Sequence, residues 1–174
     1  MKLFFKSLVI FSFLYFGNSF AQTEKIISSE SGKAKFILVE KGNASPIYVS
    51  SKDYPGVLKV AKLFQSDIKN VSETQPEIFI DSIPIKKEIV IVGTIGKNPV
   101  IDKLISDKKI NVDGIAGKWE TSLIEVVKNP LPGVERALVI AGSDKRGTIY
   151  GMFELSKQMG VSPWYWWADV PVKK

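Results

Sequence analysis

The chain has 174 residues, with 24 lysines and arginines against 18 acids, and it contains neither cysteine nor histidine. These two absences exclude disulfides, Ser-His-Asp and Cys-His catalysis within the chain, and zinc sites that depend on imidazole. The formal net charge of +6 is spread along the sequence without a basic stripe, which argues against nucleic acid as a partner. We expect neither a cofactor nor a bound metal.

Residues 1–21 have the three zones of a secretory signal: basic MKLFFK, apolar SLVIFSFLYFG and a small-residue exit at Ser19-Phe20-Ala21. We therefore expect cleavage after Ala21, a periplasmic or secreted location, and no membrane span in the mature chain. The alternative is an uncleaved anchor, but the apolar run of about a dozen residues is shorter than the roughly 20 that a spanning helix needs. An exported chain without cysteine suits a bacterial envelope protein.

Residues 22–162 are sufficient for one domain with its own core. Strands are predicted where branched and aromatic residues run together between turn residues. They cover residues 34–40, 47–49, 77–80, 88–92, 119–127 and 137–141. The runs 77–80 and 88–92 flank a turn at 81–84, and the unbroken apolar sequence of the second indicates a central strand buried on both faces.

Three helices are predicted between and after these strands. The first has apolar residues at spacings of three and four, namely Val57, Val60, Ala61, Phe64, Ile68 and Val71. The second begins with Asn98 as its cap and Pro99 in the first helical position. The third covers about 146–158 and ends at Gly160. Its inward residues are expected to be Ile149, Met152, Phe153 and Met159. The order predicts an α/β (α+β two-layer) fold, a mixed sheet with helices mainly on one face.

The turn before the third helix, in AGSDKRGTIYG, has glycines at a spacing that is typical of phosphate loops. Thr148 stands where such a loop has its lysine, directly after Gly147, so the pattern argues against a nucleotide site. One interpretation is structural: Ser143 or Asp144 caps the helix, and Gly147 permits close contact between the helix and the sheet.

The other interpretation of this turn is functional. Asp144, Lys145 and Arg146 lie at the start of a helix that follows a strand, and they are candidates for contact with a substrate or with a neighbouring domain. The planar guanidinium of Arg146 suits a carboxylate partner.

Residues 163–174 begin with the aromatic sequence PWYWW. In an extended segment successive side chains face opposite ways, so at most half of these rings can stack on one sugar. Trp164, Trp166 and Trp167 are therefore candidates either for packing at a domain interface or for contact with carbohydrate.

The acidic residues were considered as glycosidase carboxylates, because that chemistry uses two carboxyl groups about 5 to 10 Å apart. The candidates are Asp81, Asp113, Glu120, Glu135, Asp144, Glu154 and Asp169. No two of them are paired in the sequence in a way that singles them out, which is typical of acids on a solvated surface.

The last part of the chain, ALVIAGSDKRGTIYGMFELSKQMGVSPWYWWADVPVKK, resembles glycoside hydrolase family 115, the xylan α-1,2-glucuronidases. It is similar to the segment that closes the N-terminal domain of these enzymes and enters their catalytic barrel. A broader likeness exists to the small α/β domain that precedes the barrel in hexosaminidases and other α-glucuronidases.

This resemblance implies an exported bacterial enzyme that removes glucuronic acid, or its 4-O-methyl ether, from xylan side chains. It implies that residues 22–162 form a non-catalytic accessory domain, and that 163–174 link it to a missing barrel that begins after Pro171. The catalytic carboxylates would lie in that barrel, so we expect no catalytic residue in this chain and no activity of the chain alone. The expected partners are the barrel of the same polypeptide and glucuronoxylan or its oligosaccharides.

Two other functions remain open on the sequence. One is a stand-alone exported carbohydrate-binding module that uses the tryptophan cluster. The other is an exported adhesion or envelope protein without a role in sugar binding.

Overall fold

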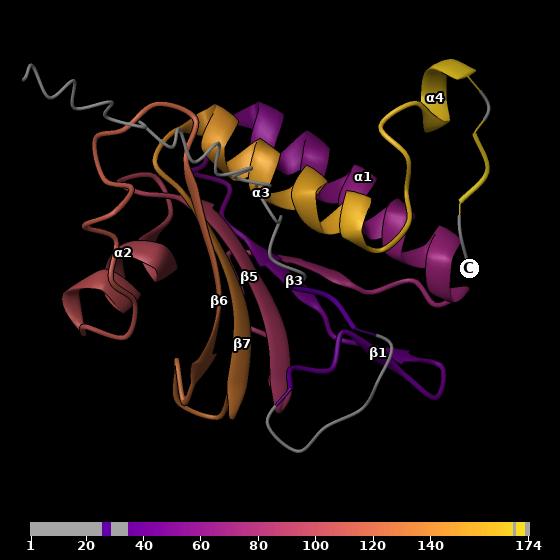
Figure 1. Ribbon diagram of the computed structural model, residues 1–174. Coiled ribbons are helices and arrows are strands. Elements are labelled where there is room, and N and C mark those ends of the chain that lie inside the picture. Colours follow the sequence, from indigo (N-terminus) through magenta and orange to yellow (C-terminus); the bar gives the residue numbers. More distant parts are fainter. Residues whose placement is uncertain (1–25, 29–34, 169, 173–174) are drawn as a thin grey trace, which may run out of the picture.

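The computed structural model describes residues 26–28, 35–168 and 170–172, so the predicted signal at 1–21 lies outside the described residues. The main feature is a five-stranded sheet with the order β4-β3-β5-β7-β6 (Figure 1). Its strands are β3 (Ile47–Val49), β4 (Ile78–Ile80), β5 (Glu88–Thr94), β6 (Ser122–Lys128) and β7 (Arg136–Gly142). The helices are α1 (Pro55–Ser72), α2 (Pro99–Ser106), α3 (Lys145–Gln158) and α4 (Tyr165–Ala168). A hairpin of β1 (Val39–Glu40) and β2 (Asn43–Ala44) lies beside the sheet.

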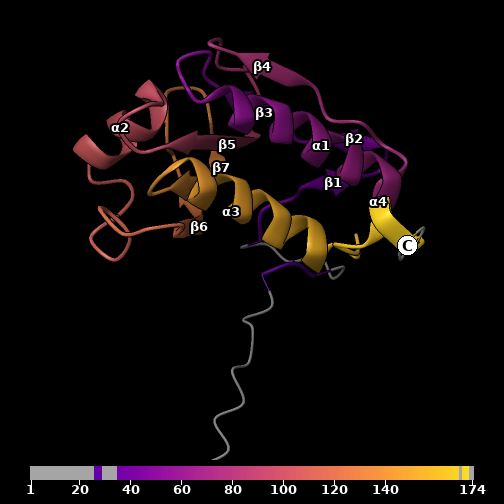
Figure 2. The same cartoon turned by 90° about the horizontal axis from the view of Figure 1, so that it is seen from above.

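The two long helices, α1 and α3, pack side by side on one face of the sheet, and α2 lies on the opposite face (Figures 1 and 2). The side chains of β5 alternate between these layers. Val90 and Val92 belong to the core beneath α1 and α3, whereas Ile89 and Ile91 belong to the core beneath α2. The predicted α/β fold with a mixed sheet is thus confirmed, and β5 is the central strand that its apolar run indicated.

The sheet is mostly parallel. β3 pairs with β4 and β5, and β5 pairs with β7, all in parallel, whereas β6 is antiparallel to β7. β4 and β5 flank a turn in the sequence, but β3 lies between them in the sheet. From β3 the chain passes through α1 outward to β4, and from β5 it passes through α2 toward the other side. The carboxyl ends of β3 and β5 therefore mark the switch point where open α/β sheets bind ligands.

The helix ends follow the local signals in the sequence. α1 begins at Pro55 and ends before Glu73, which adopts the left-handed conformation with φ 63°. The Asn98 side chain accepts hydrogen bonds from the amides of Val100 and Ile101 and so caps α2. Gly160, with φ 105°, follows α3 as expected. The cap of α2 at Asn98 and the glycine after α3 were predicted correctly, because each of these two ends depends on a single residue and its neighbours.

The predicted strand at 34–40 is wrong in length. Among the described residues 35–40, only Val39–Glu40 form a strand, β1, which turns through Lys41 and Gly42, both with positive φ, to pair with β2. The amide of Ile37 donates instead to a carboxylate oxygen of Glu88 at 3.0 Å. The Glu88 side chain thus supplies the hydrogen-bond acceptor that a neighbouring strand would otherwise provide for the Ile37 amide.

The inward position predicted for Phe153 is also wrong, because its side chain is 43% exposed. The buried face of α3 includes the small residues Thr148 and Gly151 as well as Met152 and Leu155. Glycine and threonine do not stand out as core residues in an apolar pattern. The sequence therefore assigned the buried face of α3 to large apolar residues, and Phe153 was wrongly included.

Candidate functional site

The candidate site is the carboxyl edge of the sheet, which we define as the residues at and directly after the ends of β3, β4, β5 and β7. At its centre is a buried network of Asp53, Thr94 and Thr148. One carboxylate oxygen of Asp53 accepts a hydrogen bond from the Thr94 amide at 2.7 Å, and the other accepts one from the Thr94 hydroxyl at 2.8 Å. The two threonine hydroxyls lie 2.7 Å apart. The network fastens the loop after β3 to the end of β5 and to α3, so it fills the switch point with the domain's own side chains.

Asp144 fastens the next part of this edge. Its side chain caps α3 by accepting a hydrogen bond from the Gly147 amide at 2.7 Å, and it also accepts one from the Glu120 amide at 3.0 Å. These two bonds hold the pKa of Asp144 below its ordinary value. The structural interpretation of the turn is confirmed, with Asp144 as the cap. Its carboxylate occupies the position at the helix start where an external anion would bind.

Close approach at this turn depends on glycine. A Cβ atom on Gly147 would lie 2.2 Å from the carbonyl oxygen of Thr121, and one on Gly142 would lie 2.1 Å from the backbone nitrogen of Thr148. Ser143 also binds Thr121: its amide and its hydroxyl both donate to the Thr121 carbonyl, at 2.9 Å and 3.0 Å. The turn is therefore closely packed against the residues that precede β6.

The two cations of the turn have different surroundings. Arg146 pairs with Glu120, with Nη1 2.6 Å from Oε1, and this hydrogen bond is the main reason why the pKa of Arg146 is raised. Lys145 is exposed at the start of α3. The structure thus gives Arg146 a carboxylate partner inside the domain, and both side chains still reach solvent.

Asp81 closes the edge at the end of β4. Its carboxylate accepts hydrogen bonds from the Ser51 amide at 2.9 Å and the Ser50 hydroxyl at 3.0 Å, and the bonds from Ser51 are the main cause of its lowered pKa. Like Asp53 and Asp144, it binds the backbone of a neighbouring loop. These three carboxylates hold the loops of the edge in place by accepting hydrogen bonds from backbone amides.

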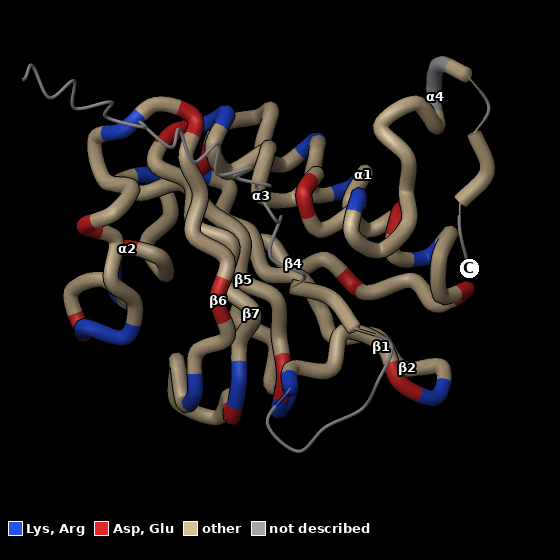
Figure 3. Tube along the Cα trace, in the orientation of Figure 1, with Lys and Arg blue, Asp and Glu red and all other residues tan. Residues whose placement is uncertain are grey.

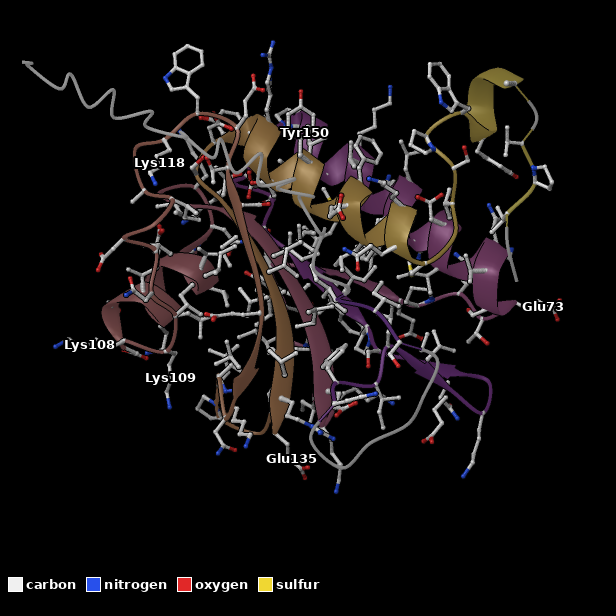
Figure 4. The ribbon with its side chains drawn as sticks, viewed as in Figure 1. Glu73, Lys108, Lys109, Lys118, Glu135 and Tyr150 are labelled. Carbon is white, nitrogen blue, oxygen red and sulfur yellow. The ribbon has the colours of Figure 1, made fainter. Side chains whose placement is uncertain are left out.

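Three aromatic residues at this edge were not predicted as site residues. Trp119 is 85% exposed, Tyr150 on α3 is 47% exposed, and Tyr54 before α1 lies under Lys97, whose Nζ is 5.4 Å from the ring centre. Figure 4 shows Tyr150 projecting outward from α3. The sequence predicts Trp119 as the first residue of a strand, where a large apolar ring gives no sign of a site residue. In the structure, β6 begins three residues later, at Ser122.

A comparison with solved structures adds a relative. No family model and no curated protein matches the chain. One matching structure is a family GH115 4-O-methyl-α-glucuronidase described as specific for decorated arabinogalactans, with 34% identity and a TM-score of 0.58. The match covers 75% of this chain and 15% of that protein. The described domain of this chain is thus related to a part of a GH115 enzyme. The chain thus spans a small part of the length of the enzyme that it matches.

In this GH115-related domain the two motifs of the sequence lie at opposite ends of α3 (Figures 1 and 2). Asp144, Lys145 and Arg146 lie at its start, whereas the aromatic run follows its end. Residues 165–168 form the short helix α4, so this run is not the extended segment that was expected. Trp164 is 64% exposed. The side chains of Trp166 and Trp167 lie outside the described part of the structure.

Among the residues that the structure describes, no group of three or more acidic residues could hold a metal ion. None of the described helices combines the length and apolar character that a membrane crossing requires. The exposed groups at the carboxyl edge of this GH115-related domain include the rings of Trp119 and Tyr150 and the Arg146–Glu120 pair.

Proposed function

We propose that this chain is the N-terminal, non-catalytic domain of an exported glycoside hydrolase that removes glucuronic acid, or its 4-O-methyl ether, from polysaccharide side chains. The observation that carries the proposal is the 34% identity to a GH115 4-O-methyl-α-glucuronidase over three quarters of this chain. The domain would support the catalytic barrel of the same polypeptide. Asp144, Lys145 and Arg146, with the tryptophans of residues 163–174, are its candidates for contact with the barrel or with the rim of the active site.

The non-catalytic role is supported by the use of the carboxylates. Asp53, Asp81 and Asp144 are each committed to hydrogen bonds with backbone amides. A glycosidase needs one carboxyl group to donate a proton and a second to act as base or nucleophile, both facing the substrate. Asp53, Asp81 and Asp144 perform a structural role instead.

The polysaccharide is part of the proposal that needs direct measurement. The sequence resemblance implies xylan, whereas the matched enzyme is described as specific for decorated arabinogalactans. The 4-O-methyl-glucuronosyl group is common to both descriptions. We propose this group as the one released and glucuronoxylan as the first substrate to test.

The test compares this chain with the polypeptide extended through the barrel that the downstream reading frame would encode. Both proteins are assayed on glucuronoxylan and on decorated arabinogalactan, and released glucuronate and 4-O-methyl-glucuronate are quantified. We expect release by the extended protein and no release above a heat-treated control by the short chain. Release by the short chain would contradict the non-catalytic role, and a downstream frame without a barrel would contradict the parent enzyme.

Export is proposed from the signal at residues 1–21. Expression of the full chain with a C-terminal tag in a Gram-negative host tests it. We expect the tagged protein in the periplasmic fraction or the medium, with an N-terminal sequence that begins at Gln22. A cytoplasmic protein that retains Met1 would contradict export.

The second candidate function is a stand-alone carbohydrate-binding module. The observation in its favour is the 64% exposure of Trp164 in the aromatic run. It predicts binding of xylan that is lost on Trp164→Ala.

A further inference from the structure

The most exposed aromatic ring at the carboxyl edge belongs to a segment that several hydrogen bonds hold in place. Trp119 is 85% exposed, although tryptophan is normally largely buried. The next residue, Glu120, has φ 55°, a left-handed conformation that is costly for a residue with a side chain. A ring that is kept in solvent at the cost of backbone strain is a candidate for contact with a ligand.

Several bonds fix this segment. The Glu120 amide donates to Asp144, the Thr121 amide donates to the Ser143 hydroxyl at 3.1 Å, and the Thr121 hydroxyl donates to the Trp119 carbonyl at 2.9 Å. The backbone of Trp119 is therefore placed before any ligand arrives. A pre-organised contact residue binds more tightly, because less conformational entropy is lost on binding.

Polar groups lie on the same two segments as the ring. Glu120, the direct sequence neighbour of Trp119, pairs with Arg146 at the start of α3. Tyr150 lies one helical turn beyond Arg146 and is 47% exposed. Figure 4 shows it projecting outward from the helix. An exposed indole and groups that donate and accept hydrogen bonds thus lie on two segments that are joined by the Glu120–Arg146 pair.

This combination suits a sugar. A pyranose ring has an apolar face that can lie on an indole, and hydroxyl groups at its rim that need both donors and acceptors. Glutamate supplies acceptors and arginine supplies donors in a fixed plane. The cores of protein interfaces are instead depleted of charged residues. The segment of Trp119 and the start of α3 carry Lys118, Glu120, Lys145 and Arg146, and these charged groups suit contact with a carbohydrate.

We propose that Trp119, Glu120, Arg146 and Tyr150 form a carbohydrate-contact surface for an acidic polysaccharide, which we name the Trp119 surface. The choice of an acidic glycan rests on the proposed function and on the cations Lys118, Lys145 and Arg146 of the two segments, which outnumber Glu120 and Asp144. The surface lies at the start of α3, whereas the aromatic run of residues 163–171 follows the end of that helix.

The experiment uses the whole chain and four substitutions. Binding of glucuronoxylan and of xylan stripped of uronic acid is measured by affinity electrophoresis and by calorimetry. We expect Trp119→Ala to weaken binding of glucuronoxylan about tenfold or more, as is typical for loss of an aromatic contact residue. The control, Ile85→Ala, removes an apolar side chain that is 94% exposed before β5 and is expected to change binding less than twofold. Trp164→Ala tests the competing contact in the aromatic run, and Arg146→Gln is expected to reduce the preference for glucuronoxylan over stripped xylan.

Folding is checked by thermal unfolding, and Trp119→Ala is expected to retain the unfolding temperature of the wild type because the indole is exposed. Unchanged binding by a folded Trp119→Ala protein would overturn the inference. Loss of binding in Trp164→Ala alone would overturn it as well and assign the contact to the aromatic run. A wild-type chain that binds neither glycan also overturns it, but leaves the proposed function intact, since that is tested by hydrolysis with the extended polypeptide. Glycan binding by the chain together with an inactive extended polypeptide would support the Trp119 surface and contradict the proposed function.

Discussion

At the carboxyl edge of the sheet, Asp53 and Asp144 accept hydrogen bonds from backbone amides, whereas at the amino edge Arg136 forms an ion pair with Glu88. We define the amino edge as the residues at and before the starts of β5 and β7. Figure 3 shows charges of both signs gathered at this lower end of the sheet. A carboxylate bound to amides fixes the backbone itself. Three carboxylates do so at the carboxyl edge, namely Asp53, Asp81 and Asp144, whereas at the amino edge Glu88 divides its oxygens between the Ile37 amide and Arg136. The backbone of the carboxyl edge is therefore fixed at more points.

The substitution expected to destabilise the carboxyl edge most is Gly147→Ala. The new Cβ would lie 2.2 Å from the Thr121 carbonyl oxygen, so α3 has to move away from the segment before β6. We expect a loss of about 3 kcal/mol in the free energy of unfolding, measured by urea denaturation. Gly114→Ala is the matched control, because a Cβ there has no neighbour within 4 Å. Equal stability of the two variants would mean that the carboxyl edge is not closely packed.

The second test removes one carboxylate from each edge. Asp53→Ala leaves the buried amide of Thr94 without its acceptor and removes one of the two partners of the Thr94 hydroxyl, and we expect a cost of about 3 kcal/mol. Glu88→Ala removes the partner of Arg136 and the acceptor of the Ile37 amide. Its groups are closer to water, so we expect about 1 to 2 kcal/mol. Urea unfolding of both variants gives the two values, and a larger loss in Glu88→Ala would reverse the comparison.

The smallest expected effect is a pH dependence at the carboxyl edge. Hydrogen bonds from the Gly147 and Glu120 amides lower the pKa of Asp144 from its ordinary value of 3.8. The stabilisation by this carboxylate is therefore fully present above pH about 4 and is lost as the pH falls through the lowered pKa of the folded state. Asn can cap a helix but does not titrate in this range.

We accordingly expect Asp144→Asn to be less stable than the wild type at pH 6, with the difference shrinking as the pH falls below about 4. Urea unfolding between pH 2.5 and 6 measures both proteins, where these limits bracket the ordinary carboxyl pKa of about 4. Asp113→Asn, at an exposed position, controls for a change of net charge. A constant difference across the range would show that the charge of Asp144 does not stabilise the fold.

Much of the fold could be predicted from the sequence because its signals are local. Pro55 and Asn98 start their helices, and the apolar run of β5 marks a strand buried on both faces. The same holds for the cap of α3, since Asp144 lies three residues before the amide that it binds. Each of these features depends on residues within one turn or one strand.

The candidate site was predicted only in part, because its contacts join distant segments. Arg146 was singled out for its chemistry, but its partner Glu120 lies 26 residues earlier in the chain. Trp119 was missed, since nothing in its neighbours signals that Ser143 and Asp144 hold the following residues away from a strand. An aromatic residue beside a strand is normally part of the core, and only the contacts across the fold place this one in solvent.

The sequence by itself determined the α/β class, the three main helices, the cap of α3 and the resemblance to a glucuronidase domain, because periodicity, capping and motif are properties of short segments. The tertiary structure decided which strands are neighbours, with β3 between β4 and β5, and which polar groups are used inside the domain. It also decided which aromatic ring stands free at the carboxyl edge. These outcomes depend on hydrogen bonds and close approaches between residues far apart in the chain, and such contacts exist only once the sheet is assembled.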